Sequence, residues 1–115
     1  QKAGVKRIIA VGGSGILNAD ENTLLVDQED YPKKYLAVGK EHQKAYEYLN
    51  ESDLDWTMIG SPEIIDNGPS GSFITKADYE PELNKYRINA GDLAMFMLNE
   101  LERNEFVRQR VGISN

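Results

Sequence analysis

One strand that ends in a glycine-rich turn constrains this fold more than any other stretch of the chain. The segment from Lys6 to Val11 is apolar and β-branched without strict alternation. That pattern is typical of a strand covered on both faces, as in a parallel sheet. The turn Gly12–Gly15 follows directly and contains one serine. Backbone N–H groups and a hydroxyl therefore gather where a ligand is able to sit.

This turn contains only half of the dinucleotide-binding fingerprint G-x-G-x-x-G. Gly13 and Gly15 supply the first two glycines, but Asn18 stands at the third position. Residues 18–23 are polar and aperiodic, so no helix opens where the fingerprint needs a helix N-terminus aimed at a pyrophosphate. We therefore interpret the segment as a strand and a turn, and not as a phosphate-binding loop.

Composition excludes several classes of function. The chain has 115 residues, of which 40% are apolar and 28% charged, so we expect residues 1–115 to form a single domain. A net charge of −6 with scattered Lys and Arg argues against nucleic acid or a membrane surface as a partner. There is neither a bilayer-spanning apolar run nor a signal peptide, and a cytoplasmic location is expected. With no cysteine and one histidine, no metal site is expected.

The first half of the chain predicts a strand, a helix and a second strand. A polar loop covers residues 12–32, and the helix runs from Pro32 to about Ser52. A second buried strand covers residues 54–60, and such strand–helix–strand units place the two strands parallel. Spacings of three and four residues predict one buried helix face, made of Tyr35, Val38, His42, Ala45 and Leu49.

The second half predicts shorter elements. Turn formers fill residues 66–72, short edge strands cover 73–75 and 85–88, and a last strand covers 107–113. A helix opens at the N-cap Asn89 and runs to Arg103, with Asp92 as a capping acid stabilised by the helix dipole. Its predicted buried face consists of Ala90, Ala94, Met97, Leu98 and Leu101.

Chemistry is expected where the two buried strands end, because open α/β sheets bind ligands outside the carboxyl ends of their strands. Ser14 is the leading candidate, since a small hydroxyl between glycines reaches a ligand without steric conflict; alternatively, it bonds its own turn. The ring of His42 is able to reach toward both strand ends, or it is a core histidine. A serine nucleophile is not expected, because no G-x-S-x-G precedes a helix.

Three segments carry a family resemblance. They are residues 45–54 leading into Asp55-Trp56-Thr57-Met58-Ile59 and Ser61-Pro62, the segment Ala3-Gly4-Val5-Lys6-Arg7-Ile8-Ile9, and the segment Ile88-Asn89-Ala90-Gly91-Asp92-Leu93-Ala94. Taken in chain order, they resemble segments of the atypical short-chain dehydrogenases, a group of NAD(P)-binding proteins. That group includes NmrA-like regulators, the biliverdin reductase B (flavin reductase) type and epimerase-like proteins.

The resemblance implies an α/β fold: the C-terminal portion of a doubly wound, Rossmann-like parallel sheet that lacks the N-terminal G-x-G-x-x-G half. It implies NAD or NADP as cofactor, with only the nicotinamide end on this chain. The family's Tyr-x-x-x-Lys motif falls on Val38 and His42, so the catalytic tyrosine is missing. The implied catalytic residues are Ser14 and His42, and the implied cofactor-binding residues are Gly12, Gly13, Ser14, His42, Ser61, Pro62 and Ile64.

Two classes of function follow from the resemblance. One is an oxidoreductase that transfers hydride to a small-molecule flavin, quinone or other carbonyl-like acceptor. The other is a non-catalytic, NAD(P)-sensing NmrA-like regulator; an epimerase/dehydratase-like protein is a further alternative. The chain does not begin with Met, and we expect it to be part of a longer protein and inactive alone. Because half a sheet exposes an edge, we also expect association with the missing half or a homo-oligomer.

Overall fold

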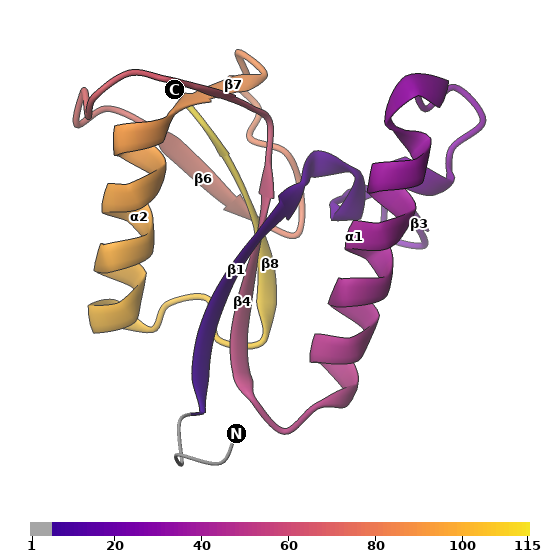
Figure 1. Ribbon diagram of the computed structural model, residues 1–115, viewed down its shortest axis with the longest axis horizontal. Helices are drawn as coiled ribbons and strands as arrows, with labels where there is room; N and C mark the ends of the chain where they lie inside the picture. Colours follow the sequence, from indigo (N-terminus) through magenta and orange to yellow (C-terminus); the bar gives the residue numbers. More distant parts are fainter. Residues whose placement is uncertain (1–5) are drawn as a thin grey trace.

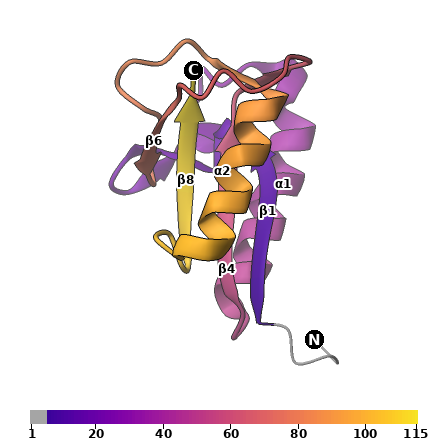
Figure 2. The ribbon, with the colours of Figure 1, turned by 90° about the vertical axis from the view of Figure 1, so that its left-hand side faces the viewer.

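The fold is a three-layer sandwich of helix, sheet and helix (Figure 1). The computed structural model describes residues 6–115, so the predicted helix end at residues 3–4 lies outside the described residues. Helix α1 (Lys33–Glu51) covers one face of a four-stranded sheet and α2 (Ala90–Arg103) covers the other. Figure 2 shows α2 in front of the sheet and α1 behind it.

The central sheet has the strand order β1-β4-β8-β6. Its strands are β1 (Arg7–Gly13), β4 (Asp55–Ser61), β8 (Gln109–Ser114) and β6 (Ile74–Ala77). β4 lies parallel to β1 and β8, and β6 joins β8 antiparallel. The predicted strand–helix–strand unit with parallel strands and the mixed, parallel-dominated α/β class are thereby confirmed.

Short elements connect these layers. The predicted loop 12–32 contains two 3₁₀ turns and a small antiparallel hairpin: η1 (Ser14–Ile16), β2 (Asn18–Asp20), β3 (Thr23–Leu24) and η2 (Leu25–Asp27). After β4, β5 (Glu63–Ile65) pairs parallel with β7 (Arg87–Asn89) in a separate small sheet. This pair extends the carboxyl end of β4 beyond the central sheet.

A row of three glycines on neighbouring strands leaves space for the segment after η1 to pack on the sheet. Gly12, Gly60 and Gly112 are register partners on β1, β4 and β8. Leu17 is fully buried above the row, and a Cβ on Gly60 would lie 2.6 Å from its Cγ. Any side chain at Gly60 would therefore push away the segment that follows Ser14.

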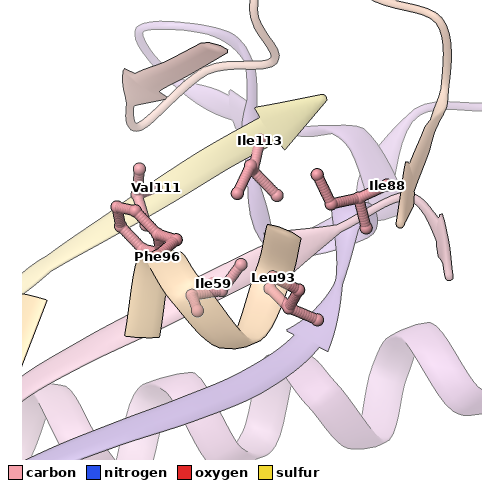
Figure 3. Packing of buried hydrophobic residues seen from close by; sticks show 6 residues of the cluster. All are labelled: Ile59, Ile88, Leu93, Phe96, Val111 and Ile113. Carbon is pink, nitrogen blue, oxygen red and sulfur yellow. The ribbon is translucent and has the colours of Figure 1, made fainter. Parts of the chain in front are cut away.

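The largest apolar core lies between the sheet and α2. Its six buried residues come from β4, β7, α2 and β8, and Figure 3 shows them around the helix: Ile59, Ile88, Leu93, Phe96, Val111 and Ile113. The predicted buried face of this helix is wrong in part, because Ala94, Leu98 and Leu101 are exposed. Apolar residues lie on both sides of α2, and the side that packs against the sheet is the one with Leu93 and Phe96.

The predicted face of α1 is also wrong in part. Tyr35 and Val38 are 53% and 59% exposed, and Ala45 is exposed. The residues turned inward are Gly39, His42, Tyr46 and Leu49, of which Tyr46 and Leu49 pack against Ile16, Trp56 and Met58. A Cβ on Gly39 would lie 2.8 Å from Val26 Cγ2. The helix therefore approaches the loop on its glycine, which apolar periodicity does not reveal.

Candidate functional site

A cavity of about 510 Å³ lies at the carboxyl ends of β1 and β4, against α1. The end of β1, η1, α1, the end of β4 and β5 all contribute to it. Its lining consists of Gly13, Ser14, Tyr31, Tyr35, Val38, Gly39, His42, Ser61, Pro62, Glu63 and Tyr86. The structure thus brings together five of the predicted site residues, namely Gly13, Ser14, His42, Ser61 and Pro62.

Ser14 is the first residue of η1 and lines the cavity. Its carbonyl oxygen accepts a hydrogen bond from the Leu17 N–H at 3.0 Å, which closes the turn. Within the described part of the chain, its hydroxyl makes no hydrogen bond. The alternative in which the Ser14 side chain bonds its own turn is therefore not what the structure shows, and the hydroxyl is available to a ligand.

Arg110 holds η1 in place from the neighbouring strand β8. Its guanidinium donates to the Ile16 carbonyl at 2.8 Å and to Asn18 Oδ1 at 2.9 Å, and it pairs with Asp78 at 3.2 Å. Its charged group also lies 4.9 Å from the centre of the Tyr46 ring. The sequence analysis did not single out this positioning residue. Its place directly before the apolar residues of a strand could have indicated a buried arginine with polar partners.

His42 is fixed by a hydrogen bond from the main chain. The Gly13 N–H donates to His42 Nδ1 at 2.9 Å. A ring nitrogen that accepts a hydrogen bond carries no proton, so the neutral imidazole has its proton on Nε2. Nε2 makes no hydrogen bond to any described residue, and the ring lines the cavity. Among the described residues Nε2 therefore has no partner, and its contact with a ligand stays a prediction.

The end of β4 supplies the opposite part of the lining. Ser61 is buried, and its hydroxyl donates to the Pro62 carbonyl at 2.9 Å. Two predicted cofactor-binding residues lie outside the lining. Gly12 is buried behind His42, and Ile64 is half-exposed on β5. Their roles, like the roles of the lining residues, stay predictions.

Charge in the cavity is low. Among its lining residues, Glu63 is the one carboxylate, and there is neither Lys nor Arg. A phosphate group would therefore meet no cationic partner in this lining, whereas an uncharged ring would lose no charge pairing. Burial, followed by the nearby Tyr35, raises the pKa of Tyr31, so its phenol keeps its proton at neutral pH.

Other features of the described residues restrict the chemistry. Residues 6–115 contain no cluster of His, Asp and Glu that could hold a metal ion. No helix within that range is both long and apolar enough to cross a bilayer. Trp56 and Met58 belong to the core under α1, together with Ile16.

Comparison with known proteins links this chain to a family that binds a nicotinamide cofactor. Residues 1–104 match the protein family described as NAD(P)H-binding. The protein YwnB of Bacillus subtilis, named as uncharacterized, is 29% identical over 118 residues, which cover 93% of this chain and 54% of YwnB.

Three solved structures are similar to this chain in sequence and in fold. A protein of Burkholderia pseudomallei that is described as a proposed exported protein is 38% identical, with a TM-score of 0.84. The match covers 99% of this chain and 57% of that protein. A proposed NADH-flavin reductase of Streptococcus pneumoniae is 26% identical with a TM-score of 0.83, covering 95% and 55%. A proposed epimerase of Bacteroides thetaiotaomicron is 25% identical with a TM-score of 0.80, covering 98% and 55%. The chain spans about half the length of these relatives.

Proposed function

Because this chain belongs to the NAD(P)H-binding family, we propose that its cavity takes the nicotinamide end of NAD(P) together with a hydride acceptor. The observation that carries the proposal is the convergence of both strand ends and His42 on one cavity, whose lining has a single carboxylate and no cation. An oxidoreductase needs such a place, where a cofactor ring and an acceptor are held next to one another.

The residues present fit a nicotinamide. Its carboxamide needs hydrogen-bond donors and acceptors but no counter-charge, and Ser14 and His42 provide unpartnered donors. The Ser61-Pro62 segment borders the same cavity with backbone groups. When bound, the nicotinamide supplies or accepts the hydride. The chain's own residues bind the amide, orient the ring and exclude water.

The class of acceptor that we propose follows from the absence of a tyrosine at position 38. Val38 lines the cavity where the related dehydrogenases carry a catalytic tyrosine. Flavins, quinones and similar conjugated acceptors need less protonic help than an isolated ketone does, because their reduced forms are weaker bases. We therefore propose a reductase for such acceptors, with Ser14 polarising the reacting group.

Val38 also favours a second candidate function. An apolar side chain at the motif's tyrosine position is compatible with a protein that binds NAD(P) without turnover. Such a sensor would use the same nicotinamide contacts but would pass the binding signal to a partner protein.

Titration of the full-length protein with NADPH and NADH, followed by turnover assays with FMN and menadione, separates these candidates. Binding of one nucleotide with acceptor turnover is the expected result. Binding without turnover across the panel supports the sensor, and no binding of either nucleotide contradicts both. Ser14→Ala is expected to lower kcat/KM about tenfold or more, as loss of a donor at the reacting group does; an unchanged rate contradicts the role of Ser14.

A further inference from the structure

We propose that Tyr31 is a catalytic residue of this cavity, whose phenol contacts the acceptor and gives it a proton. The proposal rests on the reductase function above and names a group that the sequence analysis did not single out. Tyr31 lies seven residues before Val38, so it is not part of the family's Tyr-x-x-x-Lys motif. Its place in the cavity comes from the tertiary structure alone.

Two glycines make room for the Tyr31 hydroxyl. A Cβ on Gly15 of the η1 turn would lie 2.8 Å from the phenol oxygen, and a Cβ on Gly39 of α1 would lie 3.1 Å from it. The first distance is too short for real atoms, and the second is tighter than most contacts. The phenol oxygen therefore lies between η1 and α1 because neither element has a side chain there.

The hydroxyl lies in the cavity wall without a protein partner. Tyr31 is partly buried and lines the cavity, and its hydroxyl forms no hydrogen bond with any residue in the range 6–115. Its backbone N–H donates to the Gln28 carbonyl at 3.2 Å, which holds the residue just before α1 begins. A polar atom held in a partly buried wall costs free energy unless a ligand or water completes its hydrogen bonding.

The surrounding wall suits a planar conjugated acceptor. Tyr35 and Tyr86 also line the cavity and are 53% and 65% exposed, so they form its open rim, with Pro62 beside them. Aromatic faces stack well on flat rings. Tyr31 is less exposed than the other two tyrosines. A quinone whose ring stacks at this rim is able to direct a carbonyl oxygen toward Tyr31.

The proposed step balances as follows. Reduced nicotinamide would supply the hydride, whose C–H bond breaks as an O–H bond forms at one carbonyl oxygen of the quinone. The quinone ring becomes aromatic, and an electron pair moves to the second carbonyl oxygen. The O–H bond of Tyr31 breaks and an O–H bond forms on the acceptor, which gives the hydroquinone. The resulting tyrosinate takes a proton from water. Since its pKa is raised, Tyr31 begins each cycle protonated and serves as donor, not as base.

Tyr31→Phe tests the role of the phenol oxygen, because it keeps the ring. In the full-length protein with menadione as acceptor, we expect kcat to fall about tenfold or more and the solvent isotope effect on kcat to disappear. The Kd for the nucleotide and the Tm should stay unchanged. Tyr48→Phe changes an exposed tyrosine of α1 that does not line the cavity, so it is the control and should remain within about twofold of the native rate. An unchanged kcat in Tyr31→Phe overturns the proposal.

A second measurement separates this inference from the function on which it rests. Menadione binding in the absence of nucleotide, measured by calorimetry, should weaken several-fold in Tyr31→Phe and in Gly39→Ala, whose added methyl displaces the phenol. If the native protein binds no nucleotide but shows this pattern, the reductase function fails while the Tyr31 contact stands. Equal menadione binding in native protein and Tyr31→Phe, or no menadione binding at all, overturns the Tyr31 contact.

Discussion

The two faces of the central sheet differ in how they are filled. Under α2, six apolar residues are almost completely buried in one cluster. Under α1, the corresponding cluster has three buried members, and beside it lie a buried arginine, a hydrogen-bonded histidine and the cavity. The fold thus concentrates close packing on one face. The other face keeps space and unpartnered donors for a ligand.

The charged groups show the same difference. On the α2 face, Glu100 is buried but pairs with Arg7 at 2.6 Å and accepts from the Phe106 N–H at 2.8 Å. Asp92 is fully buried and accepts from the N–H groups of Ser70 and Gly71 at 2.9 Å. Both carboxylates are therefore satisfied inside the protein, whereas the Ser14 hydroxyl and His42 Nε2 have no hydrogen-bond partner among residues 6–115.

Asp92 is more than the capping acid that the sequence predicts. Burial on its own would raise its pKa, but the hydrogen bond from the Gly71 N–H, with those from Ser70, Asn115 and Asn89, lowers the pKa below its ordinary range. Ser70 and Gly71 belong to the loop after β5, Asn89 is the last residue of β7, and Asn115 follows β8. The carboxylate thereby ties that loop to the start of α2.

Phe96→Ala should produce the largest effect, a loss of about 3–5 kcal/mol in the free energy of unfolding. Phe96 is 6% exposed and has edge or tilted contacts with Phe73 and Phe106. Tyr46→Ala is the matched change on the α1 face, where the ring is only partly buried against Trp56. Urea unfolding measures both variants, and an equal loss in the two would break the proposed difference between the faces.

Acid should weaken the α2 face through Asp92. A carboxylate with a lowered pKa in the folded state stabilises the fold at pH values above its unfolded pKa. This contribution is lost as pH falls below the ordinary value of about 3.8 and through the folded pKa. We expect Asp92→Asn to be less stable than the native protein at pH 7, with a smaller difference at pH 3. Thermal unfolding at both values checks this, and a constant difference contradicts it.

His42→Phe should affect ligand binding more than stability. The change removes the acceptor of the Gly13 N–H and the Nε2 donor but keeps a ring of similar size. We expect nucleotide affinity in the full-length protein to fall about tenfold, with a loss of about 1 kcal/mol in stability. Tyr48→Phe, on the exposed side of the same helix, is the control. Unchanged affinity in His42→Phe would remove the histidine from the site.

The smallest effect is expected on the outer surface of α1. Lys44 and Glu41 form an exposed ion pair at 3.5 Å, so Lys44→Ala should change the free energy of unfolding by less than about 0.5 kcal/mol. Chemical denaturation with and without 0.5 M salt measures this. A loss comparable to that of Tyr46→Ala would show that the α1 face depends on its surface charges.

The sequence alone determined the order of the main elements and the sheet edge at which the candidate residues lie. The apolar run before Gly12 and the run after Asp53 predict two parallel strands, which the structure confirms. The predicted cover on both faces of the first run is wrong in part, because β1 is the edge strand of the sheet and its Ile8 and Val11 are 38% and 40% exposed. Ser14, His42 and Ser61 were then expected near the two strand ends, and all three line the cavity. The order of the elements and the strand ends can be predicted because the residues that favour a strand, a helix or a turn act over short distances along the chain.

Only the tertiary structure decided which helix faces are buried and which further residues reach the cavity. Val38, Leu98 and Leu101 are apolar but exposed, because α1 turns Gly39 toward Val26 and Tyr31, and α2 turns Phe96 toward the sheet. Arg110 and Tyr31 act on the site from distant points in the chain. Their contacts depend on how side chains of different segments pack together. The spacing of apolar residues within one segment does not predict this packing.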